Sequence, residues 1–187
     1  MGCDESEDGF VQALERMVAD TRAGDVVRDR VRERGLRRAA EEESTLAGLV
    51  LDLSERQAQV GVRTSTRRTH RGRIIAVGRD FLVVRDGGAP PVFIALEALV
   101  ALRPTGVIPE DTVGRRRAPL DLSFAGVLGE LAAERSRVQV VTVDGDATSG
   151  TLRAMGTDVL TMAVDAEGRV TIHLALHAVA EVVLVDR

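Results

Sequence analysis

Hydrophobic positions in the first half of the chain follow two different spacings. Leu46, Leu49, Val50 and Leu53 recur every three or four residues, which predicts a short helix over residues 46–55. Downstream, apolar and polar residues alternate in short runs separated by Gly, Pro and Asp, a pattern typical of strands joined by tight turns. These runs predict five strands, over residues 60–64, 72–77, 81–85, 92–96 and 99–103.

The same order of elements returns in the second half of the chain. Asp80 is matched by Asp158, 78 residues later. Seven further pairs share this spacing: Gly48 and Gly126, Leu53 and Leu131, Val60 and Val138, Val62 and Val140, Gly72 and Gly150, Gly78 and Gly156, and Leu82 and Leu160. The spacing becomes 80 near the end of each unit, where Leu96 is matched by Leu176. The sequence therefore contains an internal duplication. Its second copy predicts strands over residues 138–143, 151–155, 159–164, 170–174 and 179–185.

Two segments lie outside the repeats. Phe10, Leu14, Met17 and Val18 form one apolar stripe, which predicts a helical arm near the N-terminus. Such an arm packs on the repeats, pairs with a partner helix or stands free in solvent, and the sequence does not choose among these. A stretch rich in Pro and Gly joins the repeats. The expected organisation is an acidic tail and helical arm at residues 1–43, repeat one at 44–104, a linker at 105–118 and repeat two at 119–187.

Each repeat resembles the Sm-like barrel, an SH3-type fold of one helix and five strands. The resemblance rests on the alternation of the first strand, on the bend glycines Gly72 and Gly150, and on the corners "GRD" and "GTD". It implies a mainly β fold with some helix, in which two tandem Sm-like, SH3-type small β-barrels follow the N-terminal helical arm. Each barrel would contain a helix plus five strands.

The residues by which Sm-like proteins bind uridines are replaced in this chain. Val84 and Met162 stand where such proteins have an Asn. The segment "HAVAEVV", which begins at His177, is similar to the His-Ala motif of the bacterial Sm-like RNA chaperone. The order of elements is also similar to an actinobacterial family labelled Fis-type transcriptional regulator, although no helix-turn-helix pattern is present. RNA is the ligand that the first resemblance implies.

Composition limits the compartment and the chemistry of the protein. All 25 basic residues are Arg, and Cys3 is the single cysteine, so neither an internal disulfide nor a zinc site of four Cys or two Cys and two His is expected. No apolar run reaches the length of a membrane-spanning helix, and the acidic N-terminus lacks the apolar core of a secretory signal. We therefore expect a cytoplasmic protein with no membrane partner.

No arrangement of residues predicts catalysis. Of the three histidines, only His173 and His177 are close in sequence, and on one strand they would lie about 13 Å apart. Neither a G-x-S-x-G segment nor a phosphate-binding loop is present. Asp80 and Asp158 occupy matching corners, where capping of a turn is the expected role. We expect a non-catalytic protein with no catalytic residues, no cofactor, no metal and no small-molecule substrate.

Charge divides along the chain. Residues 1–43 carry 8 Arg and 12 acids, a net charge of −4; residues 44–118 carry 12 and 7, a net charge of +5; residues 119–187 carry 5 and 10, a net charge of −5. Because the guanidinium group matches phosphate, the basic segment favours binding of nucleic acid. The resemblance to Sm-like proteins implies RNA in particular. The candidate contacts are Arg63, Arg67, Arg68, His70, Arg71, Arg73, Arg115, Arg116, Arg117 and His177.

The second hairpin supports a competing hypothesis. Asp144 and Asp146 lie at positions that match residues 66–68 of the first hairpin, so equivalent loops have opposite charges. Loops of opposite charge beside strand edges are typical of head-to-tail assemblies. The alternative function is therefore a protein–protein scaffold or self-association module that uses edge strands, these loops and the helical arm.

Overall fold

The computed structural model describes residues 45–106, 120–164 and 170–185. The chain divides into two compact units, Met1–Thr45 and Leu46–Arg187, and the second unit contains both repeats. The predicted helical arm at residues 1–43 and the linker arginines at residues 115–117 lie outside the described residues.

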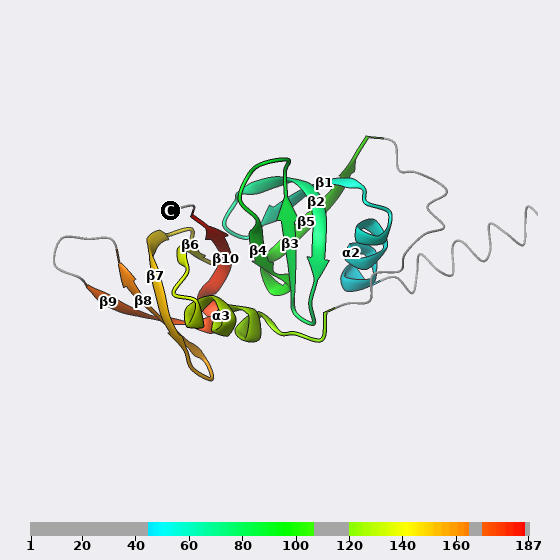
Figure 1. The fold of residues 1–187 in the computed structure, drawn as a ribbon. Coiled ribbons are helices and arrows are strands. Elements are labelled where there is room, and N and C mark those ends of the chain that lie inside the picture. Colours follow the sequence, from blue (N-terminus) through cyan, green and yellow to red (C-terminus); the bar gives the residue numbers. More distant parts are fainter. Residues whose placement is uncertain (1–44, 107–119, 165–169, 186–187) are drawn as a thin grey trace, which may run out of the picture. The chain divides into compact units, whose positions relative to one another are not determined.

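Repeat one consists of a helix and five strands (Figure 1). In chain order, its elements are α2 (Leu46–Glu55), β1 (Gln59–Thr64), β2 (Thr69–Val77), β3 (Phe81–Arg85), β4 (Val92–Ala95), the short 3-10 helix η1 (Leu96–Ala98) and β5 (Leu99–Thr105). The helix has the predicted bounds, because Val50 and Leu53 form a buried face and the helix contacts β2. Along β1, Val60 and Val62 are buried and alternate with more exposed positions, as the sequence pattern predicts.

Repeat two has the same order of elements. They are α3 (Phe124–Ala133), β6 (Arg137–Thr142), β7 (Ala147–Met155), β8 (Val159–Val164), β9 (Thr171–Ala175), the 3-10 helix η2 (Leu176–Ala178) and β10 (Val179–Leu184). The helix begins after Ser123, whose Oγ accepts a hydrogen bond from the Gly126 N–H and so caps the first turn. Two residues match when they occupy the same position in the two repeats.

All ten strands belong to one antiparallel sheet, in the order β5-β1-β2-β3-β4-β10-β6-β7-β8-β9. The prediction of two separate barrels of a helix plus five strands is therefore wrong. β4 does not return to β5 of its own repeat but pairs with β10 of repeat two, so neither repeat closes on itself. The sheet is open, and β5 and β9 are its edges. Alternation along a strand shows which face is buried, but it does not show which strand lies beside it.

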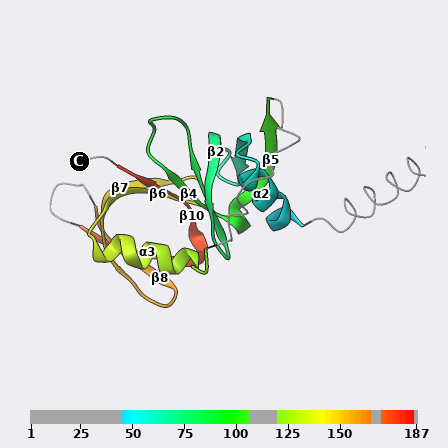
Figure 2. The ribbon, with the colours of Figure 1, turned by 45° about the vertical axis from the view of Figure 1, so that its right-hand side comes forward.

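Two hydrophobic clusters stabilise this sheet. One is centred on β1, β2 and α2, and the other on α3, β6 and β10. β3 contributes to both, because Leu82 and Val84 belong to the first cluster whereas Phe81 and Val83 belong to the second. Figure 2 shows α2 at repeat one and α3 alongside the strands of repeat two, where it contacts β7. The repeats therefore share buried surface and are not independent domains.

Gly72 and Gly150 lie where their strands approach a neighbouring strand very closely. A Cβ on Gly72, whose φ is +146°, would lie 2.3 Å from the Arg85 carbonyl oxygen. A Cβ on Gly150 would lie 2.2 Å from the Ala163 carbonyl oxygen. No side chain fits at either position, which explains why the duplication keeps glycine at both.

Candidate functional site, the junction between the repeats and its exposed version

The two repeats meet where β10 pairs with β4. Val182 lies opposite Phe93 and Val183 opposite Val92 in this antiparallel pair. β10 also pairs with β6, so both of its edges are occupied and its first four residues are buried. We call the contacts between the repeats the internal junction. It comprises the β4–β10 pair, the contact of the β1–β2 hairpin with β10, and the contact of the start of α3 with the β2–β3 corner.

Glu181 is the one acidic or basic side chain that is fully buried in the described part of the chain. Its Oε1 accepts hydrogen bonds from Thr64 Oγ1 at 2.5 Å and from Thr66 Oγ1 at 2.7 Å. The His70 Nε2 donates to the other carboxylate oxygen, Oε2, at 2.9 Å. We call these four residues the Glu181 cluster. It joins the first hairpin to the last strand and satisfies both oxygens of the carboxylate.

The surroundings of Glu181 keep its carboxyl group ionised. Burial works to raise the pKa of Glu181, but the hydrogen bonds from His70, Thr64 and Thr66 and the charge of His70 outweigh burial, so the pKa lies below its ordinary value of 4.5. A buried carboxylate is costly unless its hydrogen bonds are complete. The Glu181 cluster therefore requires side chains that donate hydrogen bonds beside the carboxylate.

The start of α3 is held by the β2–β3 corner of repeat one. The Phe124 N–H donates to Asp80 Oδ1 at 2.6 Å, and the ring of Phe124 lies 6.0 Å from that of Phe81, centroid to centroid. The Asp80 carboxylate thus satisfies a backbone donor at the positive end of a helix dipole. The predicted role of Asp80 was to cap its own turn, whereas its carboxylate caps a helix of the other repeat.

The internal junction has a second, unpaired version on the surface. β5 matches β10 and β9 matches β4, yet among the strands that the structure describes β5 and β9 are the free edges of the sheet. Val100 is 55% exposed, whereas its match Ala180 is fully buried. Leu46 is 44% exposed, whereas its match Phe124 is 4% exposed. Leu49, on the same helix, is 41% exposed. At Val100 and Leu46, repeat one thus presents to solvent apolar positions that repeat two buries.

The tips of the two hairpins approach each other at the internal junction. A Cβ on Gly145 would lie 4.0 Å from the Thr66 carbonyl oxygen. Gly145 matches Arg67, and both have positive φ angles, 94° and 65°, so the tips share a backbone form. Thr66 matches Asp144, whose pKa is lowered by a hydrogen bond from the Thr142 hydroxyl. The surface version of this contact would therefore pair an Arg with an Asp.

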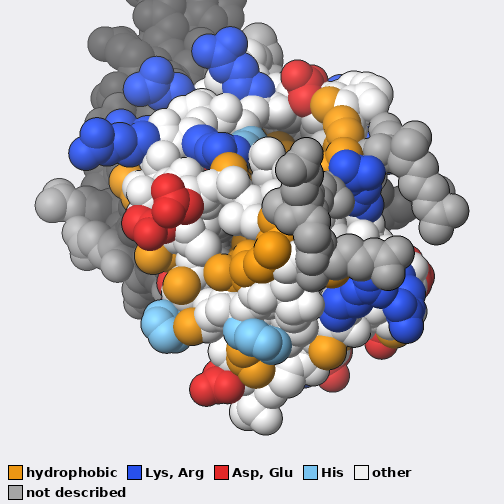
Figure 3. Space-filling model, turned by 90° about the vertical axis from the view of Figure 1, so that its left-hand side faces the viewer, with side chains coloured by type: hydrophobic (Ala, Val, Ile, Leu, Met, Phe, Trp, Pro, Cys, Tyr) orange, Lys and Arg blue, Asp and Glu red, His pale blue; other side chains and the backbone are white. Residues whose placement is uncertain are grey.

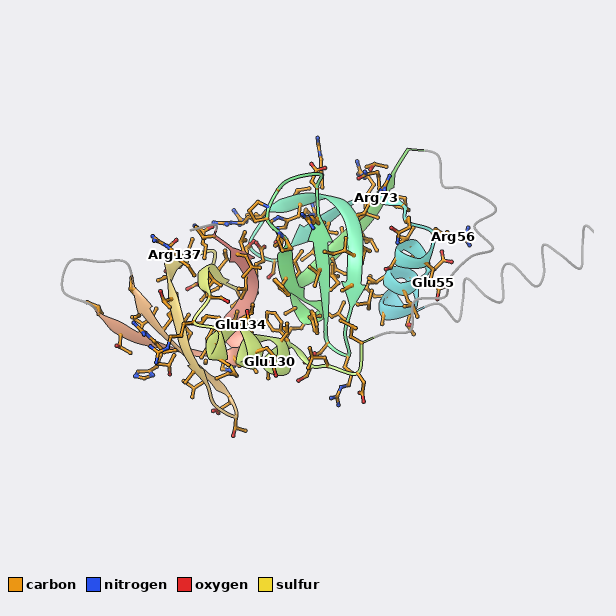
Figure 4. All side chains as sticks on the ribbon, viewed as in Figure 1. Glu55, Arg56, Arg73, Glu130, Glu134 and Arg137 are labelled. Carbon is orange, nitrogen blue, oxygen red and sulfur yellow. The ribbon has the colours of Figure 1, made fainter. Side chains whose placement is uncertain are left out.

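Arginines gather on the outer face of repeat one. Strand register places Gly61 between Arg71 on β2 and Arg103 on β5. Arg73, labelled in Figure 4, lies directly opposite Arg85 on β3. We call the following five exposed residues the basic face: Arg63, Arg71, Arg73, Arg85 and Arg103. Within the described ranges none of them forms an ion pair. Like charges directly opposite each other destabilise a sheet, so an anion that binds between them relieves repulsion.

The other predicted contacts for nucleic acid have different surroundings. Arg67 and Arg68 lie in the turn that joins β1 to β2. His70 donates to Glu181 inside the protein, so its ring serves the internal junction. His177 is exposed in η2 of repeat two. The structure therefore brings together the arginines of the first hairpin. The two histidines are separate from them, because His70 serves the internal junction and His177 lies in repeat two.

Sequence reasoning missed three residues of these surfaces. Glu181 interrupts the apolar run of β10, and its match is Ala101; an isolated acid in a buried strand was the available signal. Arg85 and Arg103 stand alone in the sequence, and only strand register brings them beside the hairpin arginines.

Figure 3 views the molecule from the left-hand side of Figure 1, where β8 and β9 lie. Hydrophobic side chains are visible on this face between arginines in the upper part and histidines in the lower part.

Among the described residues, no three His, Cys, Asp or Glu side chains group closely enough to hold a metal ion. No helix in the same ranges has the length and apolar character needed to cross a membrane. No family model matches the chain, and no curated protein matches its sequence.

Proposed function

We propose that this chain is a self-association module whose copies join head to tail through the surface version of the internal junction. β9 of one copy pairs with β5 of the next, as β4 pairs with β10 inside the chain. Transfer of the internal register places Leu102 opposite His173 and Arg103 opposite Ile172. Each chain offers one edge of each kind, so the contact is heterologous and generates a ring or an open filament.

The exposure of apolar side chains whose matches are buried carries this proposal. Leu46 would occupy the place that Phe124 has at the internal junction. There Phe124 packs on Phe81, and the match of Phe81 on the other copy is the half-buried Val159. Leu46 of one copy therefore finds an apolar partner in Val159 of the next. Open strand edges with adjacent apolar side chains favour a further strand as the occupant.

Charge supports the same arrangement. At the internal junction the Thr66 carbonyl lies against the tip of the second hairpin at Gly145. In the contact between copies, the matching residues are Asp144 of one chain and Arg67 of the next. The opposite signs of the two hairpins then attract each other, fix the register and raise the association rate.

The first test measures mass against concentration by light scattering on a sizing column, with full-length chains. Leu49→Glu places a charge on the apolar surface of α2 and should weaken association at least about tenfold, because burial of a Leu side chain contributes about 1.5–3 kcal/mol. Leu120→Glu is the matched control, since Leu120 is 46% exposed and lies outside the surface version of the junction. A wild-type chain that stays monomeric at every concentration would contradict the proposal.

A charge exchange tests the orientation of the contact. Asp144→Arg should weaken association because it opposes Arg67 of the next copy. Combination with Arg67→Asp in the same chain should restore it, since every contact then again joins opposite charges. Equal loss in the single and double variants would show that the hairpins do not meet.

A second candidate function, binding of nucleic acid through the basic face, is favoured by the opposed pair Arg73 and Arg85. Its test is fluorescence anisotropy of a labelled single-stranded RNA over a salt series. Arg73→Ser with Arg85→Ser should weaken binding and reduce the salt slope by about 0.7 for each phosphate that the variant no longer neutralises. Arg56→Ser is the control, because Arg56 pairs with Asp52 at 2.9 Å on α2. Unchanged binding and slope in the double variant would exclude the basic face as the binding site.

A further inference from the structure

The Glu181 cluster has no counterpart at the surface version of the junction. Ala101 matches Glu181, Asp144 matches Thr66 and Thr148 matches His70. The fourth member of the cluster, Thr64, is matched by Thr142, so this position is Thr in both repeats. The internal junction thus has its acid on the strand and hydrogen-bond donors on the hairpin, whereas the surface version has its acid on the hairpin and Ala on the strand. The two versions share a backbone arrangement but differ in the placement of charge.

We propose that Glu181 is the residue that reserves the β4 edge for β10 of the same chain and directs a β5 strand from a second copy to the β9 edge. The proposal builds on head-to-tail association and assigns the residue that decides which strand pairs with which edge. Strand edges present the same backbone groups whatever their sequence, so they need such a side-chain code to avoid wrong pairing.

One wrong pairing places β5 of a second copy on β4. Ala101 would then stand where Glu181 stands, and it offers no side-chain acceptor. Thr64, which is buried, would keep its contacts with the Thr66 hydroxyl at 2.8 Å and the Arg68 carbonyl oxygen at 3.4 Å but would lose its shortest hydrogen bond, and His70 would lose its carboxylate partner. Hydrogen bonds to a charged acceptor are stronger than those to a neutral one, so the loss of these bonds disfavours this pairing.

The opposite wrong pairing places β10 on β9. Glu181 would then lie against the hairpin that carries Asp144 instead of Thr66. Thr66 Oγ1 approaches Glu181 Oε1 to 2.7 Å, so the replacement brings a second carboxylate to a buried carboxylate. Like charges at that separation in a buried site repel strongly. Glu181 therefore disfavours both wrong pairings. Where it is absent, the first hairpin lacks its carboxylate acceptor, and where it meets the second hairpin, it is repelled by Asp144.

A double-mutant cycle across the internal junction tests this role inside one chain. Thr66→Asp copies the residue of the second hairpin and should raise the hydrogen-exchange rates of the β10 amides at least about tenfold relative to those of β7. Glu181→Gln in the Thr66→Asp chain should reverse most of that increase, because the amide removes the repulsion and donates a hydrogen bond to Asp. Thr66→Asn, similar in size and uncharged, is the control and should change exchange much less.

A residue with only a packing role would not produce this rescue. If Glu181→Gln adds its own destabilisation to that of Thr66→Asp, or if Thr66→Asn matches Thr66→Asp, the code is wrong. Rescue in the double variant also shows that Asp at position 66 is compatible with folding once Glu181 is replaced by Gln.

Transfer of the code to the surface version tests it between chains. In a chain with Asp144→Thr and Thr148→His, the further change Ala101→Glu should tighten association at least about tenfold, because all members of the cluster are then present across the contact. In the wild-type hairpin, Ala101→Glu should not tighten association. An equal effect of Ala101→Glu in both hairpins would overturn the proposal.

Different results would contradict the proposed self-association and the proposed role of Glu181 in selecting strand pairs. Wild-type chains that never associate remove the proposed function, and the exchange cycle at Thr66 and Glu181 still decides whether Glu181 selects its partner by charge. Association that weakens with Leu49→Glu, combined with no rescue in the exchange cycle, keeps the self-association module and removes the selector.

Discussion

His70 and Glu181 are 111 residues apart in the chain, yet the His70 Nε2 donates to the Glu181 Oε2 at 2.9 Å. This hydrogen bond joins the second strand of one repeat to the last strand of the other. It belongs to a cluster in which two threonine hydroxyls satisfy the remaining carboxylate oxygen. The repeats are therefore locked together by a polar contact as well as by shared hydrophobic surface.

Removal of the Glu181 carboxylate should destabilise the unit Leu46–Arg187, which contains both repeats. Glu181→Ala removes the charged acceptor of the hydrogen bonds from Thr64, Thr66 and His70 and should lower the free energy of unfolding by about 3–5 kcal/mol. Glu181→Gln keeps one acceptor oxygen and should cost less, about 1–3 kcal/mol. Urea unfolding followed by circular dichroism measures both. Glu97→Ala, at an exposed position in η1, is the control and should change stability by less than about 0.5 kcal/mol.

The lowered pKa of Glu181 makes stability depend on pH in a defined direction. The folded state holds the proton less tightly than the unfolded state, whose carboxyl has the ordinary value of 4.5. The contribution of Glu181 is therefore complete above pH 4.5 and is lost as the pH falls through the folded-state value. The free energy of unfolding should fall in this acidic range more steeply for the wild type than for Glu181→Gln. Parallel curves for the two chains would show that Glu181 does not titrate in this way.

The sequence predicted the local elements well because local forces determine them. The helix at residues 46–55 and the strand Phe81–Arg85 have the predicted bounds, since apolar spacing is a property of each segment alone. The order of elements is the same in both repeats, as the duplication predicts. What failed was closure. The choice of β10 rather than β5 as the neighbour of β4 depends on contacts between distant segments, among them the bond of Thr64 to Glu181.

The candidate site divides in the same way. Arg71 and Arg73 were recognisable as a cluster because they are close in sequence, and β2, which begins at Thr69, places both on one face. Arg85 joins them only through the register of β2 and β3. The pairing of His70 was not predictable, because its partner comes from the other repeat and replaces the external anion that the sequence suggested. Side chains on a single element are thus readable from sequence, whereas those assembled by long-range pairing are not.

The two bend glycines should be intolerant of any side chain. Gly150→Ala places a Cβ 2.2 Å from the Ala163 carbonyl oxygen, which forces two paired strands apart. We expect a loss of about 2 kcal/mol or more in the free energy of unfolding. Gly88→Ala is the control, because a Cβ there meets no atom within 4 Å and the residue has no positive φ. It should leave stability unchanged or raise it by up to about 1 kcal/mol through the unfolded state.

Asp80 and Asp158 occupy matching corners but should respond differently to the same change. Asp80→Ala removes the acceptor of the Phe124 N–H, so α3 loses a cap and the free energy of unfolding should fall by about 0.5–2 kcal/mol. Asp158 is exposed, and within the described ranges its carboxylate accepts no hydrogen bond. Asp158→Ala should therefore leave the stability of the isolated chain nearly unchanged. In the proposed head-to-tail contact, however, Asp158 would face the start of α2 of the next copy, so the same variant should weaken association about two- to tenfold when measured by light scattering. A loss of stability in Asp158→Ala without any change in association would mean that the carboxylate serves its own chain, and the two corners would then not be versions of one contact.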